Sequence, residues 1–305
     1  MTEKTDQRVE TGRGIASCTC LMLTNDQKSL TLDALQSYEA MGWPAPLLLL
    51  DNGQGADGAA VREKFAHRLG DDLQVFGEAT NYGVSGGRNY LAGRATSDWL
   101  VFVDNDVLFT EEVASLIDEL GHSSSDIVLP ISLNLEGRVG AAGGTYQPWL
   151  SWSRNGYLGA ELEVARRDLD RSADWGVGGG CLSVRRSTFE ATGGFDAGQH
   201  GLYGAEDIDF CLRARKQGAR SRRSASAPVI HLDQGAGADP ERKYQTLRKS
   251  SAAVRATHGV WITRYPSAWF WYLRRSPGLQ HSRRTLVSSA TNLGQATRRR
   301  ARSRL

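Results

Sequence analysis

The stretch S-D-W-L-V-F-V-D-N-D-V-L-F, residues 97–109, decides the fold class of this chain. Residues 100–103 form an apolar run rich in β-branched and aromatic side chains, which is typical of a strand buried on both faces. The run ends abruptly at Asp104, Asn105 and Asp106. Because residues i and i+2 of an extended chain point to the same side, Asp104 and Asp106 can offer their carboxylates to one ligand while Asn105 faces away.

Two carboxylates at the carboxyl end of a central strand suit a hard divalent cation, whose other ligands would be phosphate oxygens and water. The carboxyl ends of strands in open α/β sheets are also where ligands usually bind. The alternative is that the acidic residues only end a strand and solvate a loop, and a motif this short does not decide between the two.

Strand and helix patterns alternate before this stretch. We expect strands at 15–24, 46–50 and 73–76, a helix capped by Asn25 and Asp26, a helix at 57–69, and a loop at 81–89 that leads into a helix near Ala95. Short connections imply right-handed crossovers and a mainly parallel sheet covered by helices on both faces. Polar residues at the strand ends should therefore converge on one edge of the sheet.

The pattern weakens after a helix expected at 111–120 and a strand at 126–131. Residues 143–159 hold Tyr146, Trp149, Trp152 and Tyr157 among turn formers, which indicates an adaptable binding loop, with core packing of the rings as the alternative. Residues 175–184 lead three glycines into an apolar strand, where a phosphate cradle and close backbone packing remain equally open.

Acidic residues open the next expected helix, which follows Gly204 and ends at Gly218. Glu206, Asp207 and Asp209 lie in its first turn, where one carboxylate could act as a general base. The helix dipole favours acids there in any case. A short strand at 228–232 then carries His231 at its end, where it is either a metal ligand or an ordinary surface histidine.

The composition fits an enzyme: 305 residues, 40% hydrophobic and 23% charged. No run reaches the length of a membrane span, and the polar amino terminus lacks the apolar segment of a signal peptide, so we expect a cytoplasmic protein. Cys18, Cys20, Cys181 and Cys211 form no C-x-x-C pair, which favours packed thiols.

Charge is distributed unevenly along the chain. From residue 241 onward, 15 lysines and arginines accompany a single acid, and tryptophans lie beside arginines, which suits an anionic membrane surface. The alternative is a solvated tail after a docking helix. Nucleic-acid binding is the poorer hypothesis, because no such module is present and the preceding body is acidic.

Taken together, the motifs resemble those of the family 2 glycosyltransferases, which have the GT-A fold, an α/β fold with a mainly parallel central sheet. The likeness rests on D-N-G at 51–53, N-x-G-x-x-x-G-R-N at 81–89, D-x-D at 104–106, G-G-F-D at 193–196, E-D-x-D-x-x-x-R at 206–213, and His231. It covers about 70% of the chain, and the order of the motifs is more specific than any one of them.

The resemblance implies a donor site for a UDP- or dTDP-sugar. Thr24, Asp51 and Arg88 would hold the pyrimidine base, Asn81 would belong to the same nucleotide site, and Asp104 would contact the ribose and the metal region. Asp106 and His231, with Asp104 beside them, would bind Mn²⁺ or Mg²⁺ on the diphosphate.

The resemblance also implies an acceptor site. Asp207 would take the proton from an acceptor hydroxyl, giving inversion, and Glu206 would hydrogen-bond the acceptor, although the two roles are interchangeable from sequence alone. Trp149, Trp152 and Trp175 would stack on sugar rings. The acceptor would be a glycan, a lipid-linked saccharide or a secondary metabolite, met by a peripheral contact at the inner face of the membrane.

The same observations give a domain plan. We expect a disordered leader at 1–14, a catalytic domain at 15–240 with a nucleotide-binding half (15–110) and an acceptor half (111–240), and a basic, aromatic helical extension at 241–305 whose end is disordered. Two other functions are weighed: a sugar nucleotidyltransferase, for which residues 16–26 lack a Gly-rich basic motif, and a non-catalytic sugar- or membrane-binding protein, which would need no base such as Asp207.

Overall fold

The computed structural model describes residues 17–43, 45–77, 80–141, 144–147, 152–155, 159–169, 176–177, 180–198, 204–232 and 240–263. The expected leader, the tail after residue 263, and Trp149 and Trp175 lie outside this part of the chain. Trp152 is described only as part of the backbone of a strand.

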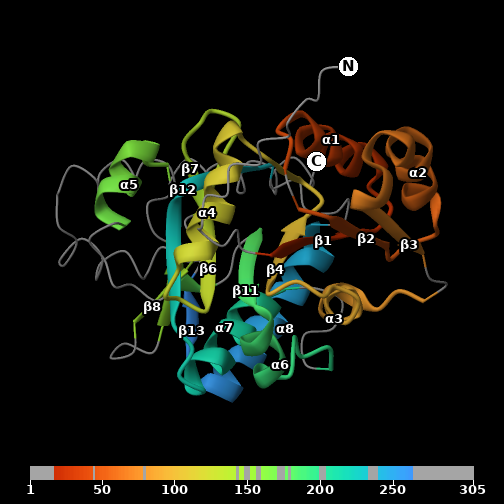
Figure 1. Cartoon of the computed structure of the whole chain (residues 1–305). Helices are drawn as coiled ribbons and strands as arrows, with labels where there is room; N and C mark the ends of the chain where they lie inside the picture. Colours follow the sequence, from red (N-terminus) through yellow and green to blue (C-terminus); the bar gives the residue numbers. More distant parts are fainter. Residues whose placement is uncertain are drawn as a thin grey trace, which may run out of the picture.

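A nine-stranded sheet forms the centre of the described structure, in the order β3-β2-β1-β4-β11-β6-β12-β5, with β7 paired to β6 (Figure 1). The first four strands in sequence run parallel to one another, and β12 runs parallel to β6, whereas β11 is antiparallel to both of its neighbours. The strands are β1 (Cys18–Thr24), β2 (Leu47–Asp51), β3 (Leu73–Gly77), β4 (Trp99–Asp104), β5 (Val107–Leu108), β6 (Ile127–Leu133), β7 (Val139–Ala141), β11 (Cys181–Arg185) and β12 (Ser221–His231). The mainly parallel sheet predicted from the sequence is thus confirmed.

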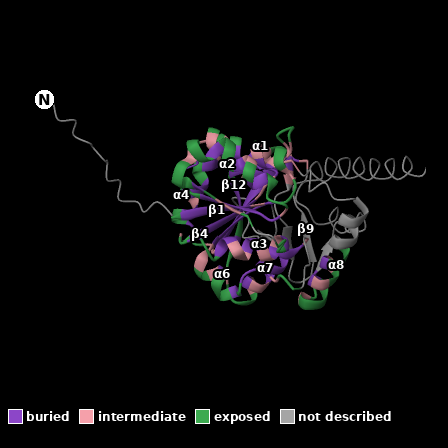
Figure 2. Cartoon of the chain, turned by 90° about the vertical axis from the view of Figure 1, so that its right-hand side faces the viewer, coloured by how far each residue is buried: buried purple, intermediate pink, exposed green. Residues whose placement is uncertain are grey.

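Helices cover both faces of this sheet (Figure 2). On one face lie α1 (Lys28–Ala40), α2 (Ala56–Leu69) and α4 (Ala114–His122), the last preceded by the short η2 (Glu111–Val113); on the other lie α3 (Gly83–Ala92), α6 (Arg186–Thr192) and α7 (Glu206–Lys216). Alternate residues of β4 serve the two layers: Val101 and Val103 pack in the first core, Leu100 and Phe102 in the second. This alternation follows from the two-residue period of a strand and fixes the direction of every side chain at its end.

The segment predicted as a loop at 81–89 is wrong, because most of it is the helix α3 and no helix begins near Ala95. Its glycines suggested a loop, but Gly87 serves close packing: a Cβ there would lie 2.9 Å from Cδ2 of Leu23 on β1. The predicted cap at Asn25 and Asp26 is also wrong. The N-cap of α1 is Gln27, and its backbone N–H donates to the Asp57 carboxylate of α2.

A second, four-stranded sheet is built from β10 (Gly176–Val177), β8 (Gly144–Gln147), β9 (Trp152–Asn155) and β13 (Trp261–Thr263). Two of these strands lie in the segment 143–159, so the prediction of a loop there is wrong in part. The remaining elements are η1 (Gly70–Asp72), α5 (Leu162–Leu169) and α8 (Pro240–His258).

Helix α8 confirms the helix predicted at 241–259. It packs back on the catalytic body, since Val254 and Val260 belong to the same core as α3, α6 and α7. With β13 it extends the described structure to Thr263. All four cysteines are free and buried, as predicted.

Candidate active site

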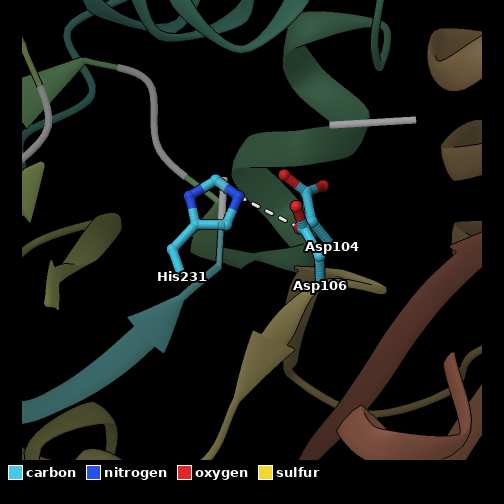
Figure 3. A group of neighbouring side chains, drawn as sticks. All are labelled: Asp104, Asp106 and His231. Atoms are coloured by element: carbon cyan, nitrogen blue, oxygen red, sulfur yellow. Dashed lines mark ion pairs between the residues drawn. The ribbon is translucent and has the colours of Figure 1, made fainter. Parts of the chain in front are cut away.

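Asp104, Asp106 and His231 form a cluster at the carboxyl edge of the central sheet (Figure 3). One ligand atom from each residue lies within 4.8 Å of the others, and Nε2 of His231 is 3.0 Å from Oδ1 of Asp106. Asp106 is almost fully buried, at 5% exposure, whereas Asp104 and His231 are partly exposed. The structure therefore brings together the three residues predicted to bind a metal.

Strand pairing explains how His231 reaches two residues that lie 125 or more positions earlier in the sequence. After the turn at 105–106 the chain forms β5, which pairs antiparallel with the end of β12 so that Val107 lies opposite His231. The carbonyl of Asp106 accepts the N–H of Leu232 at 2.9 Å. The position of the imidazole is thus set by the sheet.

Gly180, the residue before β11, lies against the cluster. Its carbonyl accepts the N–H of Asp104 at 2.9 Å. A Cβ on Gly180 would lie 3.0 Å from the His231 ring and 3.4 Å from Oδ2 of Asp104. Gly180 therefore packs closely against the cluster, and a larger residue there would press on the His231 ring.

Arg88 is buried between two carboxylates that belong to different halves of the site. Its Nη2 donates to Oδ1 of Asp104 at 2.7 Å and its Nη1 to Oε1 of Glu206 at 3.0 Å. The guanidinium lies over the ring of Phe195, 5.3 Å from its centroid. Burial alone would lower the pKa of Arg88, but the two carboxylates outweigh it and raise that pKa overall.

Glu206 and Asp207 occupy the first turn of α7 but differ in their surroundings. Glu206 is buried, and its second oxygen accepts the N–H of Gly204 at 2.8 Å. Burial raises the pKa of Glu206. The positive charge of Arg88 lowers this pKa, the negative charge of the adjacent Asp207 raises it, and the net effect is a rise. Asp207 is only partly buried. Its carboxylate is therefore the more accessible of the two.

Of the residues expected around the nucleobase, Thr24 and Asp51 end β1 and β2, whereas Asn81 lies just before α3 and Arg88 lies on α3. All four have hydrogen-bond partners. Oγ1 of Thr24 bonds to Asp57 and Thr31, and the carboxylate of Asp51, which is 1% exposed, accepts the N–H groups of Gly53 and Gly58. Asn81 is exposed, and its Nδ2 donates to Oδ1 of Asn25 at 3.0 Å. The placement at one edge agrees with the expectation, whereas contact with a base stays a prediction.

Sequence reasoning missed two contacts that fix the site. Asn89 exchanges two hydrogen bonds with the backbone of Phe195, at 2.8 and 2.9 Å, so that α3 is joined to the G-G-F-D segment. Asp209 pairs with Arg213 at 2.8 Å and with His258 of α8 at 2.7 Å. Both Asn89 and Asp209 lie in recognised motifs, but no local pattern reveals their partners.

The sequence of this chain is similar to those of known proteins. Residues 45–190 match the family model described as glycosyl transferase family 2, and residues 164–233 match one described as N-terminal domain of galactosyltransferase. A curated relative, the N-acetylglucosaminyl-diphospho-decaprenol L-rhamnosyltransferase of Mycobacterium tuberculosis, is 29% identical over 251 residues, which cover 74% of this chain and 79% of the relative. The same figures hold for a second strain of that organism.

Solved structures share the fold. GalNAc-T7 with UDP, GalNAc and Mn²⁺ superposes with a TM-score of 0.57 at 13% identity, over 86% of this chain, which spans 57% of that protein. The mannosyltransferase PcManGT of Pyrobaculum calidifontis, in complex with GDP-Man and Mn²⁺, gives 0.53 at 15% identity, over 91% of this chain and 87% of its own. These similarities show the GT-A fold.

Fold and family models together define a sugar-transferring enzyme of the GT-A class. Residues 45–190 carry a glycosyltransferase family 2 domain, in agreement with the family that the motifs indicated.

Proposed function

We propose that this chain is a metal-dependent, inverting glycosyltransferase that moves a sugar from a UDP- or dTDP-sugar to a hydroxyl of a lipid-linked saccharide. The observation that carries the proposal is the cluster of Asp104, Asp106 and His231. Arg88 links this cluster to the first turn of α7, because it donates hydrogen bonds to both Asp104 and Glu206. A nucleotide-binding edge and a carboxylate able to accept a proton thus lie on either side of one arginine.

The side chains of the cluster fit a divalent transition-series ion. Two carboxylates supply hard oxygen ligands and His231 supplies an imidazole nitrogen, a mixed set that suits Mn²⁺ better than Mg²⁺, which prefers oxygen alone. Two solved structures that share the fold contain Mn²⁺ with a nucleotide or nucleotide sugar. A bound ion would stabilise the negative charge that develops on the leaving diphosphate.

The residues of α7 supply the proton chemistry. Asp207 would receive the proton of the acceptor hydroxyl as that oxygen attacks the anomeric carbon, and a positioned base of this kind contributes roughly 10² to 10⁴ in rate. Glu206 was expected to touch the acceptor. Its two oxygens are engaged with Arg88 and Gly204, which favours a supporting role instead.

A lipid-linked acceptor is supported by the relative from M. tuberculosis, whose name specifies a decaprenol diphosphate acceptor and a rhamnosyl group. The same comparison supports a deoxyhexosyl donor in this proposal. In the described residues no helix has the length and apolar character of a membrane span. Contact with an anionic membrane through the basic residues after position 241 remains part of the proposal.

Thermal unfolding with a panel of nucleoside diphosphates, with and without Mn²⁺, tests the donor site. We expect UDP or dTDP to raise the Tm only when Mn²⁺ is present, and Asp106→Ala to abolish that rise. Asp71→Asn, a change at an exposed acid outside the site, is the matched control. A response to nucleotide that is identical in Asp106→Ala and the wild type would contradict the assignment.

Asp207→Asn tests the base. The variant should keep Mn²⁺ and nucleotide binding while losing transfer by about 10²-fold or more, because the amide accepts no proton at neutral pH. Full turnover by this variant would exclude Asp207 as the base.

A further inference from the structure

The predicted contact with a nucleobase does not explain the ion pairs that Arg88 makes. Only 6% of its side chain is exposed, and each of its two terminal nitrogens already donates to a carboxylate. One carboxylate, Asp104, ends β4 in the cation cluster; the other, Glu206, begins the helix that carries Asp207. A nucleobase carbonyl would have to reach another N–H group of a guanidinium that is almost fully buried between these two ion pairs.

Electrostatics explains why both partners are needed. An isolated buried guanidinium is very costly, whereas its planar fork can bind two carboxylates at once in fixed directions. Glu206 is buried as well, and without Arg88 it would lack the one cation that opposes the rise in its pKa. Arg88 therefore neutralises charge in both halves of the site and fixes where each half lies.

The helix on either side of Arg88 is firmly held in place. Gly87, the residue before it, packs against Leu23 of β1, and Asn89, the residue after it, bonds to the Phe195 backbone on both its oxygen and its nitrogen. The Phe195 ring lies under the guanidinium. The side chain thus extends from a helix that is fixed to the sheet on one side and to the G-G-F-D segment on the other.

We propose that Arg88 is a positioning residue that couples the cation cluster to the base helix, instead of a contact to the nucleobase. It holds Asp104 at the cluster and the first turn of α7 at a fixed distance, so that the Asp207 carboxylate faces the position of the acceptor. The inference rests on the proposed roles of the cluster and of Asp207.

The test compares Arg88→Lys and Arg88→Met with the wild type in steady-state transfer, in acceptor KM and in the Kd for UDP or dTDP with Mn²⁺. Lysine keeps the charge but cannot bridge two carboxylates in the planar geometry of arginine. We expect kcat to fall about 10²-fold in Arg88→Lys, as a displacement near 1 Å of a catalytic group does. Acceptor KM and nucleotide Kd should stay within about threefold of the wild type.

Arg94→Met is the matched control, because Arg94 follows the same helix and is exposed. Its kcat should equal that of the wild type. Melting curves and circular dichroism show whether each variant is folded, and Arg88→Lys keeps the test decisive if Arg88→Met does not fold.

Two results would overturn the inference: kcat of Arg88→Lys close to that of the wild type, or a nucleotide Kd raised about tenfold or more while the Kd for inorganic diphosphate with Mn²⁺ is unchanged. The second result would place Arg88 on the base. Failure of the proposed function looks different, since the wild type itself would then show neither transfer nor a nucleotide response that depends on Asp106.

Discussion

Asp209→Ala tests whether α8 is an integral part of the catalytic domain. Asp209 is 1% exposed and accepts hydrogen bonds from Arg213 on its own helix and from Nε2 of His258 at the end of α8. The His258 side chain is likewise 1% exposed, and its Nδ1 has no partner within the described part of the chain. Alanine would remove the acceptor that both side chains share.

The size of the effect follows from what each partner retains. Arg213 keeps hydrogen bonds to the carbonyls of Thr192 and Gly194 and is 23% exposed, so water and backbone can compensate it in part. His258 retains no side-chain hydrogen bond in the described structure, and removing one partner of a buried pair costs about 3–5 kcal/mol. We take the lower end, about 3 kcal/mol, which corresponds to a fall in Tm of roughly 6–12 °C.

Urea denaturation and differential scanning calorimetry measure this loss, with Asp71→Ala as an exposed control that should change the unfolding free energy by less than about 0.5 kcal/mol. In a His258→Leu background the effect of Asp209→Ala should shrink, giving a coupling energy of about 1–3 kcal/mol. A loss below about 1 kcal/mol, or purely additive single variants, would refute the view that this pair joins α8 to α7.

Three further outcomes are expected. Gly180→Ala should weaken Mn²⁺ binding about 10- to 100-fold by calorimetric titration, because the new methyl group would press on the His231 ring, whereas Gly77→Ala, with nothing within 4 Å, should not; equal affinities would contradict this. Thr31→Val should lower the free energy of unfolding in urea by about 1–3 kcal/mol, since the buried hydroxyl that it removes has three hydrogen-bond partners. An unchanged free energy of unfolding would show that these partners are satisfied without the hydroxyl. Burial raises the pKa of Cys18 to about 11 and that of Cys181 to about 12, so about 0.1% or less of either thiol is ionised at pH 8. Iodoacetamide should therefore label these thiols only in denaturant or as the pH rises. Fast labelling of the native protein at pH 8 would contradict their burial.

The sequence predicts the sheet well because each strand of the first half is a short apolar run between clear turn signals. Residues 47–50 are four consecutive leucines, and all four are buried in β2. Prediction failed at α3, where three glycines lie in or at the start of a helix. A glycine that provides close helix-to-strand packing has the same local signature as one that allows a turn, so only the tertiary contact of Gly87 with Leu23 separates them.

The candidate site was predictable where a motif supplies both residue type and direction. The spacing of Asp104 and Asp106 predicted that they serve one ligand, and His231 was singled out at a strand end. The structure brings the three together, although Asp106 lies in the turn after β4 and not in the strand. The partners of Arg88 were not predictable. They lie 16 and 118 residues away, and no short-range pattern specifies a contact across such distances.

The three consecutive residues of the D-N-D motif have different partners, because Asp104 ends β4 whereas Asn105 and Asp106 form the turn after it. Asp104 continues the face of Leu100 and Phe102, which packs on α3 and α7, so its carboxylate meets Arg88. Asn105 points to the opposite layer, where its Nδ2 donates to Gln27 and Thr31 at the start of α1, each at 3.0 Å.

The side chain of Asn105 thereby connects the turn to the buried hydroxyl of Thr31, which in turn bonds to that of Thr24 at the end of β1. Asp106 turns back toward His231. A displacement of α1 would therefore reach the cation cluster through Asn105, whereas a displacement of α7 would reach it through Arg88. The central asparagine thus connects the cluster to the start of α1 in the way that Arg88 connects it to the first turn of α7.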